Sequence, residues 1–425
     1  MPSTAVASPT TLTPVQPEER IIVLDVLRGF ALLGILTVNL PGAASSGYAW
    51  AAGLDPFPAW WDKSAEWFVT TFFAGKFNSI FSFLFGLGFT IQLTRASDRG
   101  VNVTSTYLRR LAILFALGVA HALLIWDGDV LHMYALLGLV LLVIRRVSDR
   151  TVFALILVSL LLPGARAAYS AITQEPWPIP RESMPARYEQ ETRVYQTGTY
   201  AEQVQERYHA LKEVYGFSVQ LRGPVMFYAS LLLTMLFGFY VGRHRIIQNL
   251  PEHVPWIKRV MVWCFVIGFL TAAIAATLFL VIEPTGRASM LTFFGGMLFT
   301  IQRPLLCLFY ISAISLLSLK SERARRLFSP LAIVGRMPLT NYLMQSVIFT
   351  TLLYSWGVGL YGRVGPAGCL GLTAVIFAVQ VLYSRWWFAR FRFGPMEWLW
   401  RGATYGQFPA LRSAPAGAAA AAVGH

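Results

Sequence analysis

Long apolar stretches alternate with short polar ones from residue 21 to residue 385. A helix that crosses a bilayer needs roughly 20 predominantly apolar residues. On that criterion the pattern predicts an all-α, polytopic membrane helix bundle with about ten transmembrane helices. The stretches expected to form them are 21–40, 68–93, 107–126, 129–145, 151–172, 223–242, 259–282, 297–319, 337–356 and 366–385.

Basic residues gather in every second loop between these stretches. Cytoplasmic loops of membrane proteins carry an excess of Lys and Arg, so the alternation predicts that both termini are cytoplasmic. The long segment 173–222 then faces outward. The basic positions are Arg95, Arg99, Arg109, Arg110, Arg145, Arg146, Arg150, Arg243, Arg245, Lys258, Arg259, Lys320, Arg323, Arg325, Arg326, Arg385, Arg390 and Arg392.

The pattern divides the chain into a membrane domain, 20–405, and two tails. Residues 1–19 are rich in Ser, Thr and Pro and lack the apolar core of a signal peptide, and 406–425 are rich in Ala and Gly, so we expect both to be disordered. The outward segment 173–222 is expected to contain an amphipathic helix, whose apolar stripe either packs on the bundle, lies in the membrane interface, or closes a site as a lid. The stripe consists of Tyr200, Val204, Tyr208, Leu211 and Tyr215.

Composition agrees with a membrane protein and excludes several other classes. Hydrophobic residues make up 56% of the 425, charged residues 13%, and the mean hydropathy is +0.54, whereas soluble domains carry about 25% charged residues. The net charge of +14 is spread over loops and does not form a nucleic-acid-binding patch. Cys264, Cys307 and Cys369 stand apart in apolar surroundings, which favours core thiols over metal ligands.

The first apolar stretch contains two charged residues, Asp25 and Arg28. A charge at the centre of a spanning helix costs about 2.5–3.5 kcal/mol. Because residues three apart share one helix face, the two side chains can pair. The pair either anchors the helix end at the headgroup boundary or faces a polar cavity inside the bundle.

The segment HALLIWDGDVLHMYALLG places His121, Asp127 and Asp129 within nine residues, near the outward side of the membrane. A histidine suits a general base near neutral pH, and a carboxylate can orient it. We therefore predict His121 as the base, oriented by Asp127 or Asp129. Asp129 is alternatively the N-cap of the following helix, and His132 is a weaker candidate for the base.

Other polar residues fall into two groups that we expect to contact substrate. On the outward side Asn39 ends the first stretch, Lys76 lies in the second, and Arg303 precedes Pro304. Lys76 either snorkels to the interface or pairs with a carboxylate in a cavity. On the cytoplasmic side, Arg28 and Arg336 suit an anionic group such as phosphate or are ordinary positive-inside anchors. Asp25 and Asn341 accompany them there.

Several motifs with known chemistry are missing from the sequence. It contains no Walker A loop, no GxSxG nucleophile elbow and no HExxH helix. These absences exclude most ATP-driven and hydrolytic activities.

Five ordered segments, LDVLRGFALLGILTVN, KFNSIFSFLFG, HALLIWDGDVLHMYALLG, GRMPLTNYLMQS and GPMEWLWR, resemble the YeiB-like bacterial membrane proteins (domain-of-unknown-function family 418). The resemblance covers roughly Arg20 to Tyr405, and His132 falls where the family pattern does not require His. The positions that match the family pattern are Asp25, Arg28, Gly29, Asn39, Lys76, Phe77, His121, Asp127, Gly128, Asp129, Gly335, Arg336, Asn341, Tyr342 and Glu397.

The opening motif is similar to that of the heparan-α-glucosaminide N-acetyltransferases, which implies a transmembrane acyltransferase with a catalytic His. Such an enzyme moves an acyl group from cytoplasmic acyl-CoA to a small-molecule, glycan or lipid acceptor outside, and needs no permanently bound cofactor or metal. The expected location is the bacterial cytoplasmic (inner) membrane, with membrane lipids and a second copy of the chain as candidate partners and no nucleic acid.

Two other functions stay open from the sequence. One is a proton- or ion-coupled transporter in which His121, Asp127, Asp129 and Lys76 form a relay, and the other is a non-catalytic membrane scaffold. Transporters of the inverted-repeat type have two halves with matching hydropathy. The sequence has no clear internal repeat, which favours the enzyme.

Overall fold

The computed structural model describes residues 21–98, 104–173, 180–219, 224–281 and 290–412. The N-terminal tail expected at 1–19 lies outside the described residues, and so does most of the C-terminal tail expected at 406–425.

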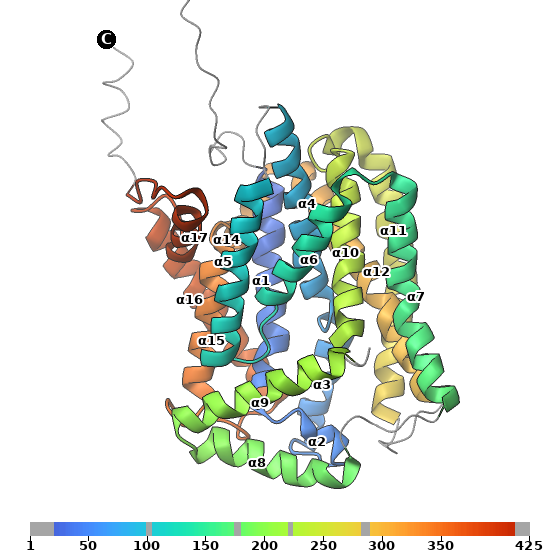
Figure 1. Ribbon diagram of the computed structural model, residues 1–425, viewed down its shortest axis with the longest axis vertical. Coiled ribbons are helices and arrows are strands. Elements are labelled where there is room, and N and C mark those ends of the chain that lie inside the picture. Colours follow the sequence, from blue (N-terminus) through green and yellow to red (C-terminus); the bar gives the residue numbers. More distant parts are fainter. Residues whose placement is uncertain (1–20, 99–103, 174–179, 220–223, 282–289, 413–425) are drawn as a thin grey trace, which may run out of the picture.

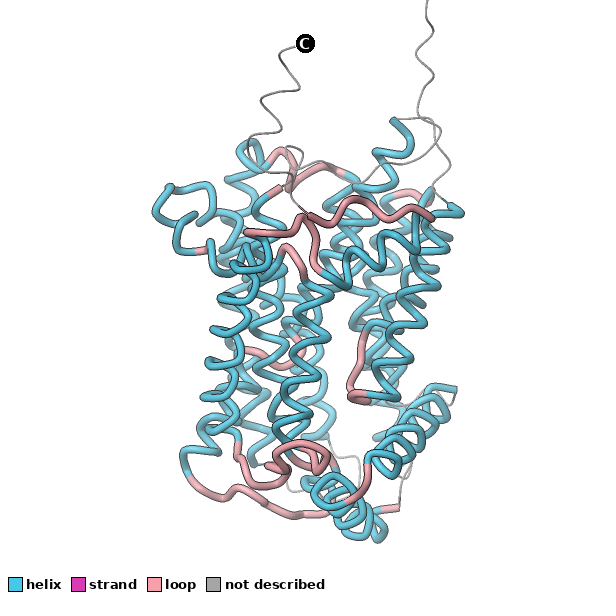
Figure 2. The backbone as a smooth tube through the Cα atoms, turned by 90° about the vertical axis from the view of Figure 1, so that its left-hand side faces the viewer, coloured by secondary structure: helices cyan, strands magenta, loops and turns pink. Residues whose placement is uncertain are grey.

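Within these ranges every element of regular structure is a helix, which confirms the all-α bundle (Figure 2). Most of the helices run along the long axis of the molecule. The α-helices of the described ranges are α1 (Ile22–Ala44), α2 (Tyr48–Ala51), α3 (Trp60–Phe72), α4 (Lys76–Asp98), α5 (Thr104–Leu124), α6 (Leu131–Val143), α7 (Asp149–Thr173), α8 (Met184–Thr197), α9 (Tyr200–Val219), α10 (Pro224–Arg243), α11 (Val254–Val281), α12 (Met290–Lys320), α13 (Glu322–Leu327), α14 (Ser329–Gly335), α15 (Pro338–Leu353), α16 (Pro366–Phe388) and α17 (Pro395–Tyr405).

Among the described residues, 7 helices are long and apolar enough to cross a membrane. The chain is therefore a multi-pass membrane protein. These helices match seven of the expected spans, and they cover Ile22–Ala44, Trp60–Asp98, Thr104–Leu124, Asp149–Ser170, Leu250–Leu278, Phe293–Lys320 and Pro366–Phe388.

The remaining three expected spans are shorter helices. The stretch 129–145 forms α6, of 13 residues, 337–356 forms α15, of 16 residues, and the apolar part of α10 is Phe227–Arg243. The helix α15 ends at Leu353 because the chain then folds back along it. Leu360 and Tyr361 donate their backbone N–H groups to the carbonyls of Leu352 and Leu353.

The second expected span, 68–93, is broken into α3 and α4. The break covers residues 73–75, where Gly75 has φ +78°, a left-handed conformation that glycine adopts without steric cost. Phe72 at the end of α3 packs 5.7 Å from the Phe269 ring, inside the candidate span Leu250–Leu278. The break therefore lies at the level of the middle of α11 and not at an end of the bundle.

The two ends of the bundle differ. The start of α1, the short helices α13 and α14 and the C-terminal α17 lie at one end, whereas α8 and α9 cross the opposite end (Figure 1). Loops with basic residues meet at the first end: the Arg243 guanidinium donates to the carbonyls of Arg145 and Val147. This arrangement agrees with the expected separation of basic loops from segment 173–222.

Glycines allow the helices of the bundle to approach closely. A Cβ at Gly29 of α1 would lie 1.9 Å from the Leu331 carbonyl oxygen of α14, and one at Gly335 would lie 1.9 Å from that of Asp25. The helices α4 and α10 approach each other in the same way: a Cβ at Gly86 would clash with the Met235 carbonyl oxygen, and one at Gly238 with that of Phe83. Small residues are typical of such contacts in membranes, because association there depends on close packing.

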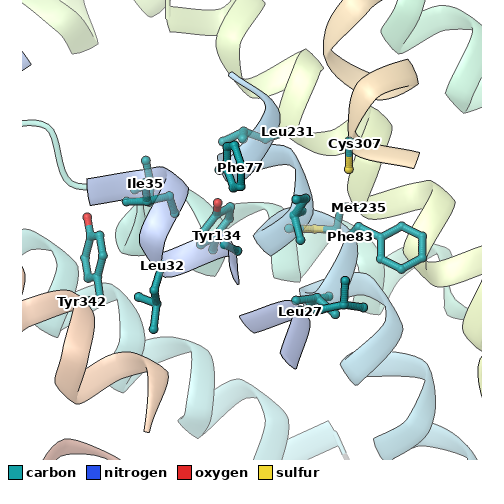
Figure 3. Close-up of a cluster of buried hydrophobic side chains, with 14 of the residues drawn as sticks. Leu27, Leu32, Ile35, Phe77, Phe83, Tyr134, Leu231, Met235, Cys307 and Tyr342 are labelled. Atoms are coloured by element: carbon teal, nitrogen blue, oxygen red, sulfur yellow. The ribbon is translucent and has the colours of Figure 1, made fainter. Parts of the chain in front are cut away.

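The core is continuous from α1 to the surrounding helices. Leu27, Leu32 and Leu36 of α1 are fully buried, and in Figure 3 the rings of Tyr342 and Tyr134 lie on either side of Leu32 and Ile35. The helix α1 is therefore the central element of the bundle, and the polar residues nearest to it are buried with it.

The proposed orientation is testable with single cysteines at exposed sites, because Cys264, Cys307 and Cys369 are all buried. We expect Gln190→Cys to react with a membrane-impermeant maleimide added to intact cells. Glu322→Cys is expected to react only after the membrane is opened. Labelling of position 322 from outside, or protection of position 190, would contradict the orientation.

Candidate functional site

The connection between α5 and α6 folds back into the bundle, so that α6 begins part-way along α5 (Figure 1). A Cβ at Gly118 of α5 would lie 2.3 Å from the backbone nitrogen of His132 in the first turn of α6. The absence of a side chain at Gly118 is therefore what lets the start of α6 reach α5. This contact places Asp129 beside His121, one helical turn beyond Gly118.

Two imidazoles bind one carboxylate at this point. His121 Nδ1 lies 3.0 Å from Asp129 Oδ1, and His132 Nδ1 lies 2.8 Å from Asp129 Oδ2. The His132 backbone N–H also donates to Oδ2, at 3.2 Å, and the Tyr342 hydroxyl donates to Oδ1, at 3.4 Å. We call His121, Asp129 and His132 the His–Asp–His cluster.

The cluster is almost completely removed from the surface. The exposed fractions are 2% for His121, 1% for Asp129 and 1% for His132. The tyrosine rings of Tyr342 and Tyr215 lie 5.4 Å from His121 and 6.1 Å from His132, respectively. A buried carboxylate needs hydrogen-bond donors, and here the two Nδ1 atoms supply them.

Binding through Nδ1 determines the tautomer of each neutral imidazole. If Nδ1–H donates to the carboxylate, Nε2 carries a lone pair and acts as an acceptor. Both Nε2 atoms are buried and have no hydrogen-bond partner within the described structure. The cluster therefore presents two basic nitrogen atoms to which no described residue donates a hydrogen bond.

The structure distinguishes between the two carboxylates expected beside His121. Asp129 contacts the imidazole, whereas the electrostatic neighbours of Asp127 are Arg207 and Glu206 of α9. Burial raises the pKa of Asp127 above its ordinary value. Val130, and not Asp129, occupies the N-cap position of α6. Asp129, one residue earlier, still accepts the N–H of His132 in the first turn of the helix. His132, the weaker candidate from the sequence, contacts Asp129 as closely as His121 does.

The cluster does not have the form of a metal site. In the part of the chain described here, no group of three or more His, Cys, Asp or Glu side chains is arranged to hold a metal ion. Both oxygens of Asp129 already accept hydrogen bonds from imidazole Nδ1 atoms.

The pair expected in the first span is present. Arg28 Nη1 lies 2.9 Å from Asp25 Oδ1, with the Asp25 side chain buried and that of Arg28 31% exposed. Since Asp25 lies on the face of α1 that meets Gly335 of α14, the pair lies at the end of the bundle opposite α8 and α9.

Three further residues of that end hold helices together. The Asn341 amide donates to the Val334 carbonyl and to Ser384 Oγ, and it accepts from Gln380. The Glu397 carboxylate accepts the N–H groups of Leu339 and Thr340, so that it caps the N-terminus of α15. The Arg336 guanidinium lies 3.9 Å from the centre of the Phe388 ring.

The outward-side residues predicted to contact substrate do not all gather at the His–Asp–His cluster. Lys76 Nζ donates to the Thr70 carbonyl at 2.7 Å instead of pairing with Asp127 or Asp129. Arg303 lies beside Gly75, in the break between α3 and α4. Asn39 is partly buried on α1.

The way in which α9 covers the site was not predicted from the sequence. Arg207 and Gln203, four residues apart, are fully buried and face the bundle, and Arg207 donates to the carbonyls of Leu123 and Leu124 at the end of α5. Helix C-termini have free carbonyls that favour a cation. The tyrosines of the expected stripe are less buried, at 38–54% exposed, although the Tyr200 hydroxyl donates to the Leu124 carbonyl and the Tyr215 ring lies near His132.

Comparison with known proteins identifies the family. Residues 241–407 match the family described as "Protein of unknown function (DUF418)". "Uncharacterized protein YxaH" of Bacillus subtilis is 34% identical over 408 residues, which cover 93% of this chain and 97% of that protein. The chain belongs to the DUF418 family. "Uncharacterized protein YeiB" of Escherichia coli is 32% identical over 422 residues, which cover 91% of this chain and 96% of that protein.

The DUF418 match and the candidate site cover different parts of the chain. Residues 241–407 include Tyr342, Asn341 and Glu397, whereas His121 and Asp129 precede the matched segment. The full-length relatives extend over the helices that carry the His–Asp–His cluster. In this chain Tyr342 of the matched part lies against a carboxylate from the N-terminal half.

A partly buried carboxylate, Glu191 of α8, connects the helices α8 and α9 to the bundle. It accepts hydrogen bonds from Ser46 and from the Tyr361 hydroxyl, the latter at 3.4 Å. Burial, together with the nearby carboxylates Asp127 and Glu206, raises the pKa of Glu191 to about 7, against the opposing effect of the Ser46 hydrogen bond.

This pKa predicts that the contacts of α8 loosen as the pH rises. Because the pKa of Glu191 is about 7 in the folded protein and 4.5 is the ordinary value, the side chain binds more protons when the protein is folded. Stability of its contacts therefore falls between these two values and stays low above the higher one. We expect hydrogen exchange in α8, corrected for the intrinsic rate, to be faster at pH 8 than at pH 5.5. Glu191→Gln removes this difference and the exposed Glu189→Gln keeps it; equal protection of the unmodified protein at both pH values would contradict the prediction.

Proposed function

We propose that this protein is a transmembrane acyltransferase of the bacterial cytoplasmic membrane. It would take an acyl group from an acyl-CoA on the cytoplasmic side and transfer it to a hydroxyl or amine acceptor at the outward side. The observation that carries the proposal is the contact of His121 Nδ1 with Asp129 Oδ1, which leaves His121 Nε2 as a buried base. The bacterial origin of the relatives supports the location.

The chemistry needs one base that later acts as an acid. His121 Nε2 takes the proton of the acceptor O–H or N–H while the acceptor atom bonds to the thioester carbonyl carbon. The C–S bond then breaks, and the imidazolium returns its proton to the leaving thiolate. Asp129 holds the imidazole in the required tautomer and stabilises its charged form. His132 and Tyr342 keep the carboxylate in place.

The two ends of the bundle suit the two substrates. His121 lies one turn from the outward end of α5, beneath α9, where an acceptor from outside arrives first. At the opposite end, Arg28 and Arg401 both lie within electrostatic range of Arg110. Guanidinium groups suit the phosphates of a nucleotide-type donor.

A second function, a proton relay in a transporter, is favoured by one observation. Two imidazoles share the two oxygens of a single buried carboxylate. In such a relay a proton enters at the Nε2 atom of one ring while the Nδ1 proton of that ring passes to Asp129. The other ring, carrying its proton on Nε2, accepts the proton of Asp129 at Nδ1 and releases its own from Nε2. Acyl transfer needs only one of the two rings as a base, so the two functions differ in what they demand of His132.

Proteoliposomes with acyl-CoA outside and envelope extract as acceptor inside test the proposal, because release of free CoA thiol does not depend on knowing the acceptor. Cytoplasmic-side-out protein should release thiol. His121→Ala should lower the rate by about 10²–10⁴-fold, the usual contribution of a general base. Asp129→Asn, whose amide donates to Nδ1 and forces the wrong tautomer, should lower it similarly, and His132→Ala by much less.

Folded yield and a pH indicator inside the vesicles supply the controls. His121→Ala should retain the yield and the labelling pattern of the unmodified protein. Equal thiol release by His121→Ala and the unmodified protein would refute the assignment. Proton movement without thiol release, lost equally in His121→Ala and His132→Ala, would establish the relay instead.

A further inference from the structure

Two cationic side chains lie together at the break between α3 and α4. Lys76 is fully buried, and its Nζ lies 5.7 Å from the centre of the Phe299 ring. The Arg303 guanidinium lies 4.3 Å from the centre of the same ring. Both residues fall within helices that are long and apolar enough to cross a membrane, Trp60–Asp98 and Phe293–Lys320.

No counter-charge accompanies them in the described ranges. Every ion pair recorded there involves other residues, and neither Lys76 nor Arg303 has a carboxylate within 4.0 Å. Charged groups inside a membrane bundle normally pair with each other or with backbone carbonyls. Two neighbouring cations repel each other, so the site as it stands is electrostatically incomplete.

The described residues supply a hydrogen-bond acceptor to Lys76 but none to the Nε atom of Arg303. Lys76 Nζ donates to Thr70 O and the Tyr310 hydroxyl donates to Phe72 O, so these carbonyls at the end of α3 are satisfied. The guanidinium of Arg303 has five N–H donors, yet its described contacts are the Phe299 ring and the surface of Gly75. Its Nε atom is buried without a hydrogen-bond partner.

The backbone adds to the positive potential. The helix α4 begins at Lys76, so its N-terminal turn faces the break. The first N–H groups of a helix and its dipole favour an anion, and interrupted membrane helices use such ends to bind anionic groups. Gly75 leaves the space that the guanidinium needs, because a Cβ there would lie 2.5 Å from Arg303 Nε.

The neighbours of the break are aromatic and apolar. Phe77 stacks on Phe73 at 5.1 Å and on Tyr310 at 5.5 Å. Farther along α12, Phe294 and Met297 are 51% and 41% exposed, as expected of a surface in contact with lipid. An anionic headgroup with attached hydrocarbon chains matches this combination better than a hydrophilic anion does.

We propose that Lys76, Arg303 and the N-terminal turn of α4 form a binding site for a phosphate group, which an anionic phospholipid supplies from the membrane. The phosphate oxygens accept from the guanidinium and the ammonium and complete the charge balance at the break. The site is separate from the His–Asp–His cluster and does not depend on acyl transfer.

Native mass spectrometry of the delipidated protein, titrated with phosphatidylglycerol or phosphatidylcholine of the same chains, tests the proposal. The unmodified protein should bind phosphatidylglycerol more tightly. Arg303→Gln should weaken that binding by about ten- to a hundredfold, the range for loss of charge-assisted hydrogen bonds, and Arg303→Lys should restore part of it. The matched control is Arg326→Gln, which removes an exposed arginine from the α13 surface.

Inorganic phosphate distinguishes the source of the group. If free phosphate at millimolar concentration displaces phosphatidylglycerol from the unmodified protein but not from Arg303→Gln, the site takes a free anion, and the lipid assignment is overturned. Equal phosphatidylglycerol affinity in Arg303→Gln and Arg326→Gln would overturn the site itself.

A second measurement needs no substitution, in case Arg303→Gln does not fold. A phosphatidylglycerol carrying a photoreactive group next to the phosphate should label peptides of α3, α4 or α12 around Lys76 and Arg303. Phosphatidylcholine with the same group should not. Labelling confined to other helices would contradict the proposal.

Discussion

A carboxylate buried inside a membrane helix bundle needs donors from the protein, because lipid supplies none. For Asp129 these donors come from three helices: His121 of α5, His132 of α6 and Tyr342 of α15. This requirement accounts for several features of the fold. The chain after α5 turns back into the bundle, α6 has only 13 residues, and Gly118 leaves room for the first turn of α6. The arrangement that satisfies Asp129 also determines which imidazole nitrogens remain available for chemistry.

The same constraint operates at both ends of the bundle. Glu397 finds its donors at the N-terminus of α15, and Arg207 finds its acceptors at the C-terminus of α5. In each case a charged side chain completes the hydrogen bonding of a helix end that would otherwise be unsatisfied. Arg303 departs from this rule, since no hydrogen bond to its guanidinium is found in the described residues.

Much of the fold and part of the site follow from the sequence. Apolar length predicted the helix bundle, and the spacing of Asp25 and Arg28 predicted their ion pair, because both depend on neighbours along the chain. The contact of His121 with Asp129 was also expected, since only a short turn separates them. The inclusion of His132 and Tyr342 was not expected, because it depends on how far α6 re-enters the bundle and on where α15 packs. The burial of Gln203 and Arg207 was not predicted either. The apolar stripe on α9 indicated that the face carrying these two polar residues would be exposed to solvent.

The protonation of the two imidazoles decides whether the His–Asp–His cluster has the chemistry that we assign to it. The most direct test is ¹⁵N NMR of the purified protein with labelled histidine, with His121→Gln and His132→Gln used to assign the signals. The structure predicts that, when neutral, each ring carries its proton on Nδ1, with an Nε2 resonance typical of an unprotonated nitrogen. Protonated Nε2 atoms in both neutral rings would mean that Asp129 does not orient them, and would contradict the account of this site.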